Sequence, residues 1–296
     1  MSARKVLVTG SSNGFGYLIV QSLLSKGHTV YATMRGAAGK NSAKAAELSS
    51  FAEGKSGAIH ILDMDVTDDA SVEQAVAKAV ELGGIDVVVN NAGYGVAGYT
   101  EAVTTDQMKH IFDVNVFGVH RVIRAALPGM RAQGSGLFIN ISSVMGRVVL
   151  PFASPYTATK FALEGFSESL RYELAPIGVD VTIIEPGGFG TGFLAAMVAG
   201  TDEARLEGYG PLKEIPDQMW GGFEQALASD DAPDPQLIAD AALELIETPA
   251  GQRPLRVVVD PMSGGEGPSA INGLTGEIQT GLMTNFGMAD SLSVKG

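Results

Sequence analysis

The sequence predicts an α/β fold in which one parallel sheet is covered by helices on both faces. Two observations support this prediction. Short apolar runs, which are typical of buried strands, alternate with longer segments of helical periodicity. The alternation extends from residue 5 to residue 259 without a linker that would divide the chain into two folding units. We therefore expect a doubly wound, seven-stranded parallel sheet in a single domain.

The expected strands are the apolar runs at residues 5–9, 30–34, 59–62, 86–90, 137–141, 179–184 and 256–259. Periodicity and turn signals predict the helices at residues 14–25, 43–51, 71–82, 105–131, 155–174 and 235–247. In the first helix Leu18 and Leu23 fall on one side, and Gly27 follows as a stop signal. Asp68 and Asp69 precede the third helix, where acidic side chains favour a helix N-terminus.

Two later segments depart from the alternation. Residues 187–235 are rich in Gly, Pro, Asp and Met and carry the only tryptophan, Trp220. An insertion of this length in a compact domain is typical of a substrate-binding loop or lid. We assign it to a catalytic domain of residues 1–262. Residues 263–296 include the run SGGEGPSA and are expected to form an irregular tail.

Composition argues against several functions and partners. The formal net charge of −13 disfavours nucleic acid and anionic membranes as partners. The chain has no cysteine, which excludes thiolate metal sites and cysteine nucleophiles, and its four histidines lack metal-site spacing. Neither a signal-peptide core nor an apolar run of the roughly 20 residues that span a membrane is present. We expect a cytoplasmic protein with no metal, membrane or nucleic-acid partner.

A glycine-rich turn joins the first strand to the first helix. Gly10, Gly14 and Gly16 are spaced G-x-x-x-G-x-G, which differs from the G-x-G-x-x-G dinucleotide fingerprint and lacks the Gly-Lys of a P-loop. Glycine lets the backbone approach a pyrophosphate closely, and the helix N-terminus supplies free N–H groups. Taken alone, the turn also fits a strand–helix junction that binds no ligand.

Further motifs follow in order at the expected strand ends and in two helices. They are Asn90-Asn91-Ala92-Gly93, Asn115, Ser142-Ser143, Tyr156-x-x-x-Lys160 and Pro186-Gly187 followed by Thr191. Together with the glycine spacing, this order resembles the short-chain dehydrogenase/reductase family over residues 5–191. The resemblance implies a Rossmann-like fold and an NAD(P)-dependent interconversion of a ketone or aldehyde and an alcohol by hydride transfer.

The resemblance also implies a catalytic set of Asn115, Ser143, Tyr156 and Lys160. Tyr156 would be the acid/base, Ser143 would orient the substrate oxygen, and Asn115 would hold a water that links Lys160 to solvent or brace a neighbouring backbone. Lys160 lies one turn from Tyr156 and would bind the nicotinamide ribose. A free phenol titrates near ~10, and a neighbouring ammonium is expected to lower the pKa of Tyr156.

The implied cofactor positions are Gly10, Ser12, Asn13, Gly14, Phe15, Gly16, Arg35, Asp65, Val66, Asn91, Ala92, Gly93, Lys160, Pro186, Gly187 and Thr191. NAD-preferring relatives place an acid at the end of the second strand, where it binds the adenosine ribose. Here Met34 occupies that place, and Arg35 follows as a partner for a 2′-phosphate. We therefore expect a preference for NADP(H) over NAD(H).

Candidate pocket positions are apolar or aromatic and predict a neutral, moderately hydrophobic substrate. They are Tyr94, Val144, Met145, Phe152, Phe189, Phe193 and Met197.

By resemblance, the helices at 105–131 and 156–174 pair across a two-fold axis in a homodimer or homotetramer. Two alternatives are a catalytically silent NAD(P)-binding regulator and a nucleotide-sugar epimerase or dehydratase. The retained Tyr156 and Lys160 argue against the first, and the glycine spacing argues against the second.

Overall fold

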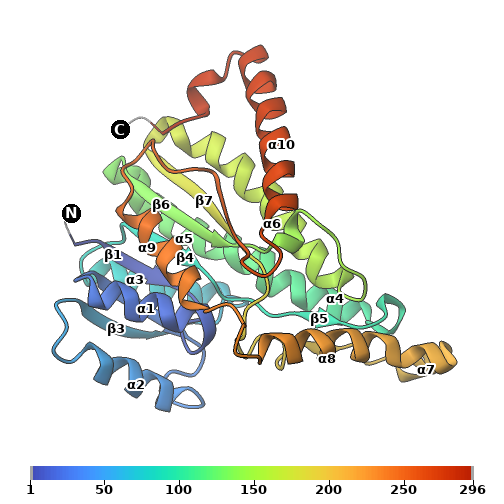
Figure 1. Cartoon of the computed structure of the whole chain (residues 1–296). Helices are drawn as coiled ribbons and strands as arrows, with labels where there is room; N and C mark the ends of the chain where they lie inside the picture. The colour runs from blue at the N-terminus through green and yellow to red at the C-terminus, as the bar shows by residue number, and fades with distance from the viewer. Residues whose placement is uncertain (1–2, 295–296) are drawn as a thin grey trace.

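A computed structural model describes residues 3–294 and contains one seven-stranded parallel sheet (Figure 1). Its strands are β1 (Lys5–Val8), β2 (Thr29–Met34), β3 (Ala58–Asp63), β4 (Val87–Asn90), β6 (Gly136–Ile141), β7 (Val179–Pro186) and β9 (Arg256–Val259). They lie in the order β3-β2-β1-β4-β6-β7-β9, and every neighbouring pair is parallel. The predicted fold class is confirmed.

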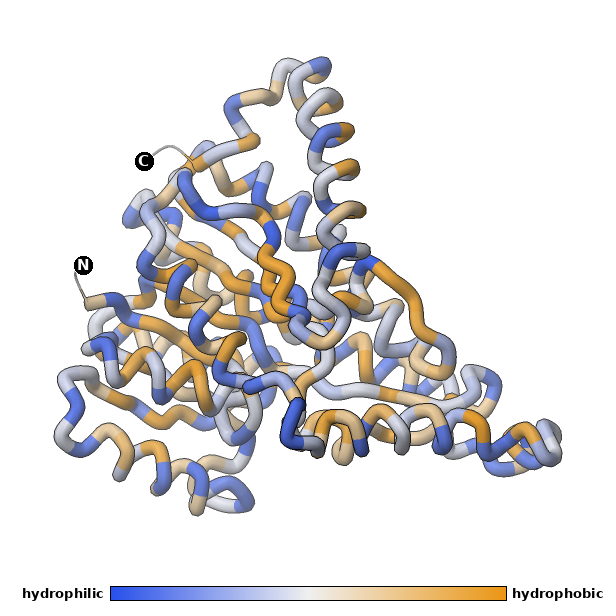
Figure 2. The backbone as a smooth tube through the Cα atoms, viewed as in Figure 1, coloured by the Kyte–Doolittle hydropathy of each residue, from blue (hydrophilic) through white to orange (hydrophobic). Residues whose placement is uncertain are grey.

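Helices cover both faces of the sheet. One face packs against α1 (Gly14–Ser25), α2 (Ser42–Ala52) and α9 (Gln236–Glu247), and the other against α3 (Asp69–Glu81), α5 (Gly118–Gln133) and α6 (Ser154–Leu174). Along β1, Val6 and Val8 point into the first core and Leu7 points into the second. The inner strands are buried on both sides and form the hydrophobic centre in Figure 2, and β1 and β4 among them are short apolar runs.

The fourth crossover is not the single α-helix expected over residues 105–131. Helix α4 (Thr105–Phe112) passes into a π-helical segment, Asp113–Phe117, and only then into α5. A π-helical turn inserts one extra residue, shifts the helix face and occurs often at functional sites. The irregular turn contains Asn115, which is buried.

The segment expected as a lid has secondary structure of its own. It contains a short strand, β8 (Val198–Ala199), paired with β5 (Val96–Ala97), and the helices α7 (Glu203–Glu207) and α8 (Ile215–Leu227). Figure 1 shows α7 and α8 extending away from the sheet near the carboxyl ends of its strands. This position places the segment over the edge at which ligands bind in such sheets.

The expectation of an irregular tail after residue 262 is wrong. Helix α10 (Glu266–Asn285) runs through most of this region and projects from the body (Figure 1). Its glycines each lower helix propensity by about 1 kcal/mol relative to alanine, which hides the helix from pattern reading. Hydrogen bonds from α10 to the rest of the domain offset this low helix propensity. Asn272 Nδ2 donates to Glu185 at 2.7 Å, and Arg147 Nη2 donates to Thr275 at 2.8 Å.

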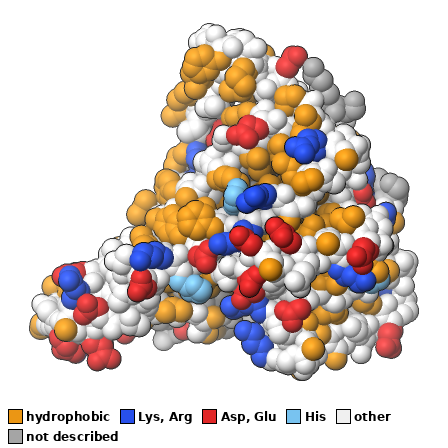
Figure 3. Space-filling view, turned by 180° about the vertical axis from the view of Figure 1, so that it is seen from behind, with side chains coloured by type: hydrophobic (Ala, Val, Ile, Leu, Met, Phe, Trp, Pro, Cys, Tyr) orange, Lys and Arg blue, Asp and Glu red, His pale blue; other side chains and the backbone are white. Residues whose placement is uncertain are grey.

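Helix α10 also carries an exposed apolar stripe. Leu274, Ile278, Leu282 and Phe286 repeat every four residues and are all exposed. Hydrophobic side chains are accordingly visible on the projecting part of the surface at the top of Figure 3. Within residues 3–294, however, we find no helix that combines the length and apolar character needed to cross a membrane.

Candidate active site

A cavity of about 890 Å³ opens at the carboxyl ends of β1 and β4. The chain leaves β1 toward β2 and β3 and then returns to β4 on its other side, which makes this junction the topological switch point. The glycine loop, the segment after β4, the start of α6 and the residues after β7 all reach it. The cavity is lined by most of the expected cofactor positions: Gly10, Ser12, Asn13, Gly14, Phe15, Arg35, Asp65, Val66, Asn91, Ala92, Gly93, Lys160, Pro186, Gly187 and Thr191.

The three loop glycines have different physical roles. Gly10 has φ +65°, and a Cβ there would lie 2.9 Å from the Ala92 Cα. Gly14 has φ +53° and faces open space, with Thr191 as its nearest neighbour at 3.9 Å. Gly16 is buried away from the cavity lining, and its Cβ would lie 2.5 Å from the Gly10 carbonyl oxygen. Gly16 therefore permits close packing of helix on loop, whereas Gly10 and Gly14 shape the surface that a ligand meets.

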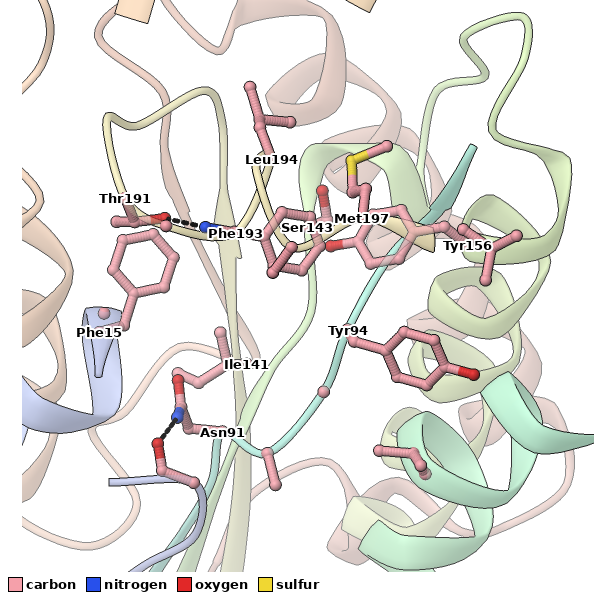
Figure 4. Close-up of a pocket in the computed structure, with 18 of the residues that line it drawn as sticks. Phe15, Asn91, Tyr94, Ile141, Ser143, Tyr156, Thr191, Phe193, Leu194 and Met197 are labelled. Atoms are coloured by element: carbon pink, nitrogen blue, oxygen red, sulfur yellow. Dashed lines mark hydrogen bonds between the residues drawn. The ribbon is translucent and has the colours of Figure 1, made fainter. Parts of the chain in front are cut away.

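The loop is held by residues at the end of β4. Asn91 Nδ2 donates to the carbonyl oxygens of Thr9 and Gly10 at 3.0 and 3.1 Å, in the contact drawn at the lower left of Figure 4. The Thr9 hydroxyl in turn accepts from the backbone N–H groups of Asn91 and Ala92, each at 3.0 Å. Sequence reasoning missed Thr9, because nothing in its spacing distinguishes it from a strand-end threonine.

The N-terminus of α1 fits a phosphate group. Asn13 precedes the helix, its side chain does not cap the first turn, and no acidic residue lies in that turn. The first N–H groups of a helix lack intrahelical partners and carry partial positive charge. Gly14 leaves room beside them that a Cβ would fill, whereas Gly10 allows the loop to approach Ala92 closely. The residues present therefore fit the pyrophosphate of a dinucleotide.

The adenosine end of the cavity is formed after β2 and β3. Met34 is buried, and Arg35 follows with its side chain 56% exposed and an Nη1 atom 4.0 Å from the Asp65 carboxylate. Asp63, which sequence reasoning missed, accepts from the backbone N–H groups of Gly36 and Ala37 at 3.0 and 3.1 Å. This bonding fixes the turn that presents Arg35 to solvent at the rim.

Ser143, Tyr156 and Lys160 meet in the middle of the cavity. Figure 4 shows the hydroxyls of Ser143 and Tyr156 close to each other, from the end of β6 and the first turn of α6. Lys160 Nζ lies 5.5 Å from the centre of the Tyr156 ring and donates to the Ile141 carbonyl at 2.8 Å. Helix α6 is held against the sheet by Asn140, which donates to Ser167 at 2.8 Å.

The expectation that the pKa of Tyr156 is lowered is wrong for the protein chain alone, because its surroundings raise this pKa. Burial raises the pKa of Tyr156 to about 12, and a hydrogen bond with Ser143 opposes the rise only in part. Burial also lowers the pKa of Lys160 to about 8, with Glu164 opposing it. Desolvation disfavours the charged forms of both groups, and the hydrogen bond with Ser143, not the charge of Lys160, is what lowers the pKa of Tyr156. At neutral pH Tyr156 is therefore a protonated phenol.

Asn115 makes direct contacts with the protein backbone. Its Nδ2 donates to the Tyr94 carbonyl at 2.9 Å and to Thr159 Oγ1 at 3.1 Å, and its Oδ1 accepts from the Tyr94 N–H at 3.1 Å. These bonds join the segment after β4 to α6. The bracing role considered from the sequence is thus present, and the water-holding role remains a prediction.

Apolar side chains dominate the part of the cavity beyond Tyr156. Of the expected pocket residues, Tyr94, Val144, Met145, Phe189, Phe193 and Met197 line the cavity as a whole. Phe152 does not: it has φ +60°, its ring packs on Tyr99, and its carbonyl accepts from Trp220 Nε1 at 3.3 Å. Gln107 and His110 of α4 also line the cavity and were missed, because a single polar residue on a helix carries no pattern that points to a pocket.

Comparison with known proteins agrees with this geometry. A family model described as short chain dehydrogenase matches residues 4–202. The chain therefore belongs to the short-chain dehydrogenase family and is an oxidoreductase of that class. Two solved structures with this fold contain a nicotinamide cofactor or its derivative: an alcohol dehydrogenase from Thermococcus sibiricus is complexed with 5-hydroxy-NADP, and a short chain dehydrogenase/reductase from Burkholderia phymatum is in complex with NAD. Among residues 3–294, no cluster of His, Asp or Glu that could hold a metal was found.

Three relatives illustrate the range of similarity. A 3-ketodihydrosphingosine reductase from Bacteroides thetaiotaomicron is 39% identical over 194 residues, covering 65% of this chain and 66% of that protein. The 17-beta-hydroxysteroid dehydrogenase type 1 of Mus musculus is 36% identical over 252 residues, covering 84% of this chain and 72% of that protein. The crystal structure of a short-chain dehydrogenase from Streptomyces avermitilis has a TM-score of 0.73 at 32% identity, covering 96% of each chain. The chain spans about two thirds of the length of the first of these relatives.

Proposed function

We propose that the protein is an NADP(H)-dependent oxidoreductase that reduces a ketone or aldehyde to an alcohol and catalyses the reverse reaction. The observation that carries the proposal is the meeting of two hydroxyls, Ser143 and Tyr156, beside Lys160 in a cavity that continues to the glycine loop. When bound, the nicotinamide cofactor supplies or accepts the hydride. Side chains of the cavity orient the substrate and handle its proton.

Tyr156 is proposed as the proton donor to the substrate oxygen. Because its pKa is raised to about 12, its hydroxyl stays protonated at neutral pH and can donate. Ser143 would hold the same oxygen and stabilise the charge that develops on it. For the reverse direction Tyr156 must lose its proton, and the Lys160 ammonium is the nearby charge that favours this loss.

The cofactor preference is proposed from the end of β2. A buried Met34 cannot accept hydrogen bonds from ribose hydroxyls as a carboxylate does. Arg35 lies at the cavity rim and has a guanidinium group that can pair with a 2′-phosphate. The Arg35 contact with Asp65, at 4.0 Å and half exposed to solvent, is weak enough to give way to a phosphate.

A neutral, bulky and largely apolar substrate is proposed from the cavity walls. Phe193, Met197 and Trp220 contribute apolar surface beyond Tyr156, and no Lys or Arg other than Lys160 and Arg35 lines the cavity within residues 3–294. The names of two relatives, which refer to ketodihydrosphingosine and to 17-beta-hydroxysteroids, agree with apolar substrates.

Turnover with NADPH against a panel of carbonyl compounds tests the substrate class. The panel should pair cyclic and long-chain aliphatic ketones with keto acids of equal size. We expect kcat/KM to rise with apolar size and to be at least about tenfold lower for each keto acid, because a buried carboxylate would lack a cationic partner. Equal or better turnover of the keto acids would contradict the proposed substrate class.

For the assembly, we propose that α4–α5 and α6 of one protomer pack against the same helices of a second copy across a two-fold axis. Phe117, at the end of the π-helical segment between α4 and α5, and Phe161 of α6 are 51% and 43% exposed, which is more than large aromatic side chains favour. Sedimentation equilibrium should give a multiple of the chain mass, and the Phe117→Asp/Phe161→Asp double variant should sediment as a monomer. Leu274→Asp on α10 serves as the control and should leave the mass unchanged. A monomeric unaltered protein would refute the pairing.

A further inference from the structure

A buried cluster of charged side chains lies directly behind the proposed catalytic residues. Arg256 of β9 lies at its centre: its Nε donates to Glu164 at 2.8 Å and its Nη2 donates to Glu168 at 2.6 Å, both on α6. Its Nε also lies 3.4 Å from Glu185 of β7. Glu164 and Glu185 are 2% and 0% exposed. Buried charges are costly unless they are paired, so this arrangement needs a physical explanation.

The carboxylates outnumber the cations within the cluster. Glu164, Glu168 and Glu185 share Arg256, and within residues 3–294 Arg147 is a second guanidinium that acts on Glu185. Helix α10 contributes Asn272, which is neutral, to the Glu185 carboxylate. Burial and the neighbouring Glu164 charge raise the pKa of Glu185 to about 7, so Glu185 carries only part of a negative charge at neutral pH. Lys160, one helical turn from Glu164, is a further buried cation beside this cluster.

Glu164 is the member of the cluster nearest to Lys160 along α6, and among residues 3–294 the two side chains form no direct ion pair. It follows Lys160 by one helical turn on α6, so the two side chains lie on the same face. A Cβ on Gly146 would lie 2.9 Å from Glu164 Cγ, 2.9 Å from Ser142 Oγ and 3.3 Å from the Lys160 carbonyl oxygen. Only the bare glycine lets Glu164 pack this close to the end of β6. The Glu164 Oε1 atom is buried without a hydrogen-bond partner among residues 3–294.

We infer that Glu164 is a positioning residue that keeps the Lys160 ammonium charged, and that Arg256 holds the Glu164 carboxylate in place for this purpose. The inference rests on the proposed function, in which the charge on Lys160 serves Tyr156. It extends the site by one turn of α6 and explains why a buried acid cluster adjoins the cavity. The charged or titratable groups around Lys160 and Glu164 are Tyr156, Glu168, Arg147, Glu185 and Arg256.

The electrostatics of Lys160 agree with this role. Burial lowers the pKa of Lys160 to about 8, and the charge on Glu164 raises it against that effect. Lys160 is therefore mostly charged at neutral pH, although its pKa of about 8 lies only a little above neutrality. Loss of the Glu164 charge should lower the pKa of Lys160 further, so that a lower pH is needed to restore the ammonium.

An NMR titration of protein labelled with 13C at the lysine Cε tests the inference, with Lys160→Arg to assign the signal. In Glu164→Gln the Lys160 midpoint should fall by about one pH unit, which is a tenfold change in its proton affinity. Glu168→Gln is the matched control, because Glu168 binds the same Arg256 one turn further from Lys160, and it should change the midpoint little. An unchanged midpoint in Glu164→Gln, or equal changes in both variants, would overturn the inference.

Turnover measurements on the same variants separate this inference from the proposed function. If both hold, kcat of Glu164→Gln should be several-fold low at pH 8 and recover toward the unaltered value as the pH falls. A shifted Lys160 midpoint in a protein that reduces no carbonyl compound would refute the function alone. Glu164→Gln keeps the side-chain shape, and Arg256 keeps Glu168 and Glu185 as partners. Should it fail to fold, Glu164→Leu, which also removes the carboxylate and leaves Arg256 paired with Glu168 and Glu185, is titrated instead and should show the same fall in the Lys160 midpoint.

Discussion

Replacing Tyr156 with phenylalanine should lower kcat for ketone reduction by roughly 10²- to 10⁴-fold, the range that a positioned general acid contributes. The change removes only the hydroxyl. The ring should keep its contact with Phe193, at 5.4 Å between centroids, and Lys160 should keep its bond to Ile141. We therefore expect the Kd for NADPH, measured by fluorescence titration, to stay within about twofold, because no phosphate or ribose contact is assigned to the hydroxyl.

Tyr94→Phe provides the matched control for this experiment. Tyr94 also lines the cavity, but in Figure 4 its hydroxyl points away from Ser143 and Tyr156. Its loss should change kcat by much less than the loss of the Tyr156 hydroxyl. Near-normal kcat in Tyr156→Phe, or equal losses in the two variants, would remove Tyr156 from the proposed acid/base role.

Replacing Arg35 with alanine should weaken NADPH binding by about tenfold or more and leave NADH binding almost unchanged. A hydrogen bond to a charged group contributes roughly 1.5–3 kcal/mol, and the half-exposed position of Arg35 favours the lower end of that range. The 2′-phosphate is present only on NADPH, so the loss should appear only there. Direct titration of both cofactors into both proteins measures the effect.

Lys44→Ala is the control for general electrostatics near this end of the cavity. Lys44 lies on α2 and pairs with Glu47 at 2.7 Å, away from the cavity lining. Its removal takes away the same charge without a proposed phosphate contact. Similar losses for NADPH and NADH in Arg35→Ala, or an equal NADPH loss in Lys44→Ala, would refute the assigned contact.

The sheet could be predicted from the sequence because its strands are buried on both faces. Strands such as Val87–Asn90 and Gly136–Ile141 are buried and carry a nearly continuous apolar run. Helix α10 could not be predicted in this way. Its stability comes from contacts distant in sequence, such as Asn272 with Glu185, which no local pattern reveals. The break at residues 113–117 likewise depends on how Asn115 bonds to Tyr94 and Thr159.

The site residues were predictable where motif and strand end coincide. Gly10, Asn91 and Tyr156 were expected at the cavity and line it, because parallel strands bring their carboxyl ends to one edge. The charge states were not predictable, since the pKa of Tyr156 depends on burial that only the packed structure defines. The same holds for Glu164 and Arg256, which come from α6 and β9 and meet only in the fold.

The most direct test of the proposed function is the absorbance change at 340 nm when the purified protein meets an apolar ketone with NADPH, and separately with NADH. The structure predicts steady NADPH oxidation that depends on the ketone, is slower with NADH at equal concentration, and is almost abolished in Tyr156→Phe. Turnover that favours NADH would contradict the assigned cofactor. NADPH binding without turnover of any carbonyl compound would contradict the proposed reaction and favour a regulator that binds the cofactor.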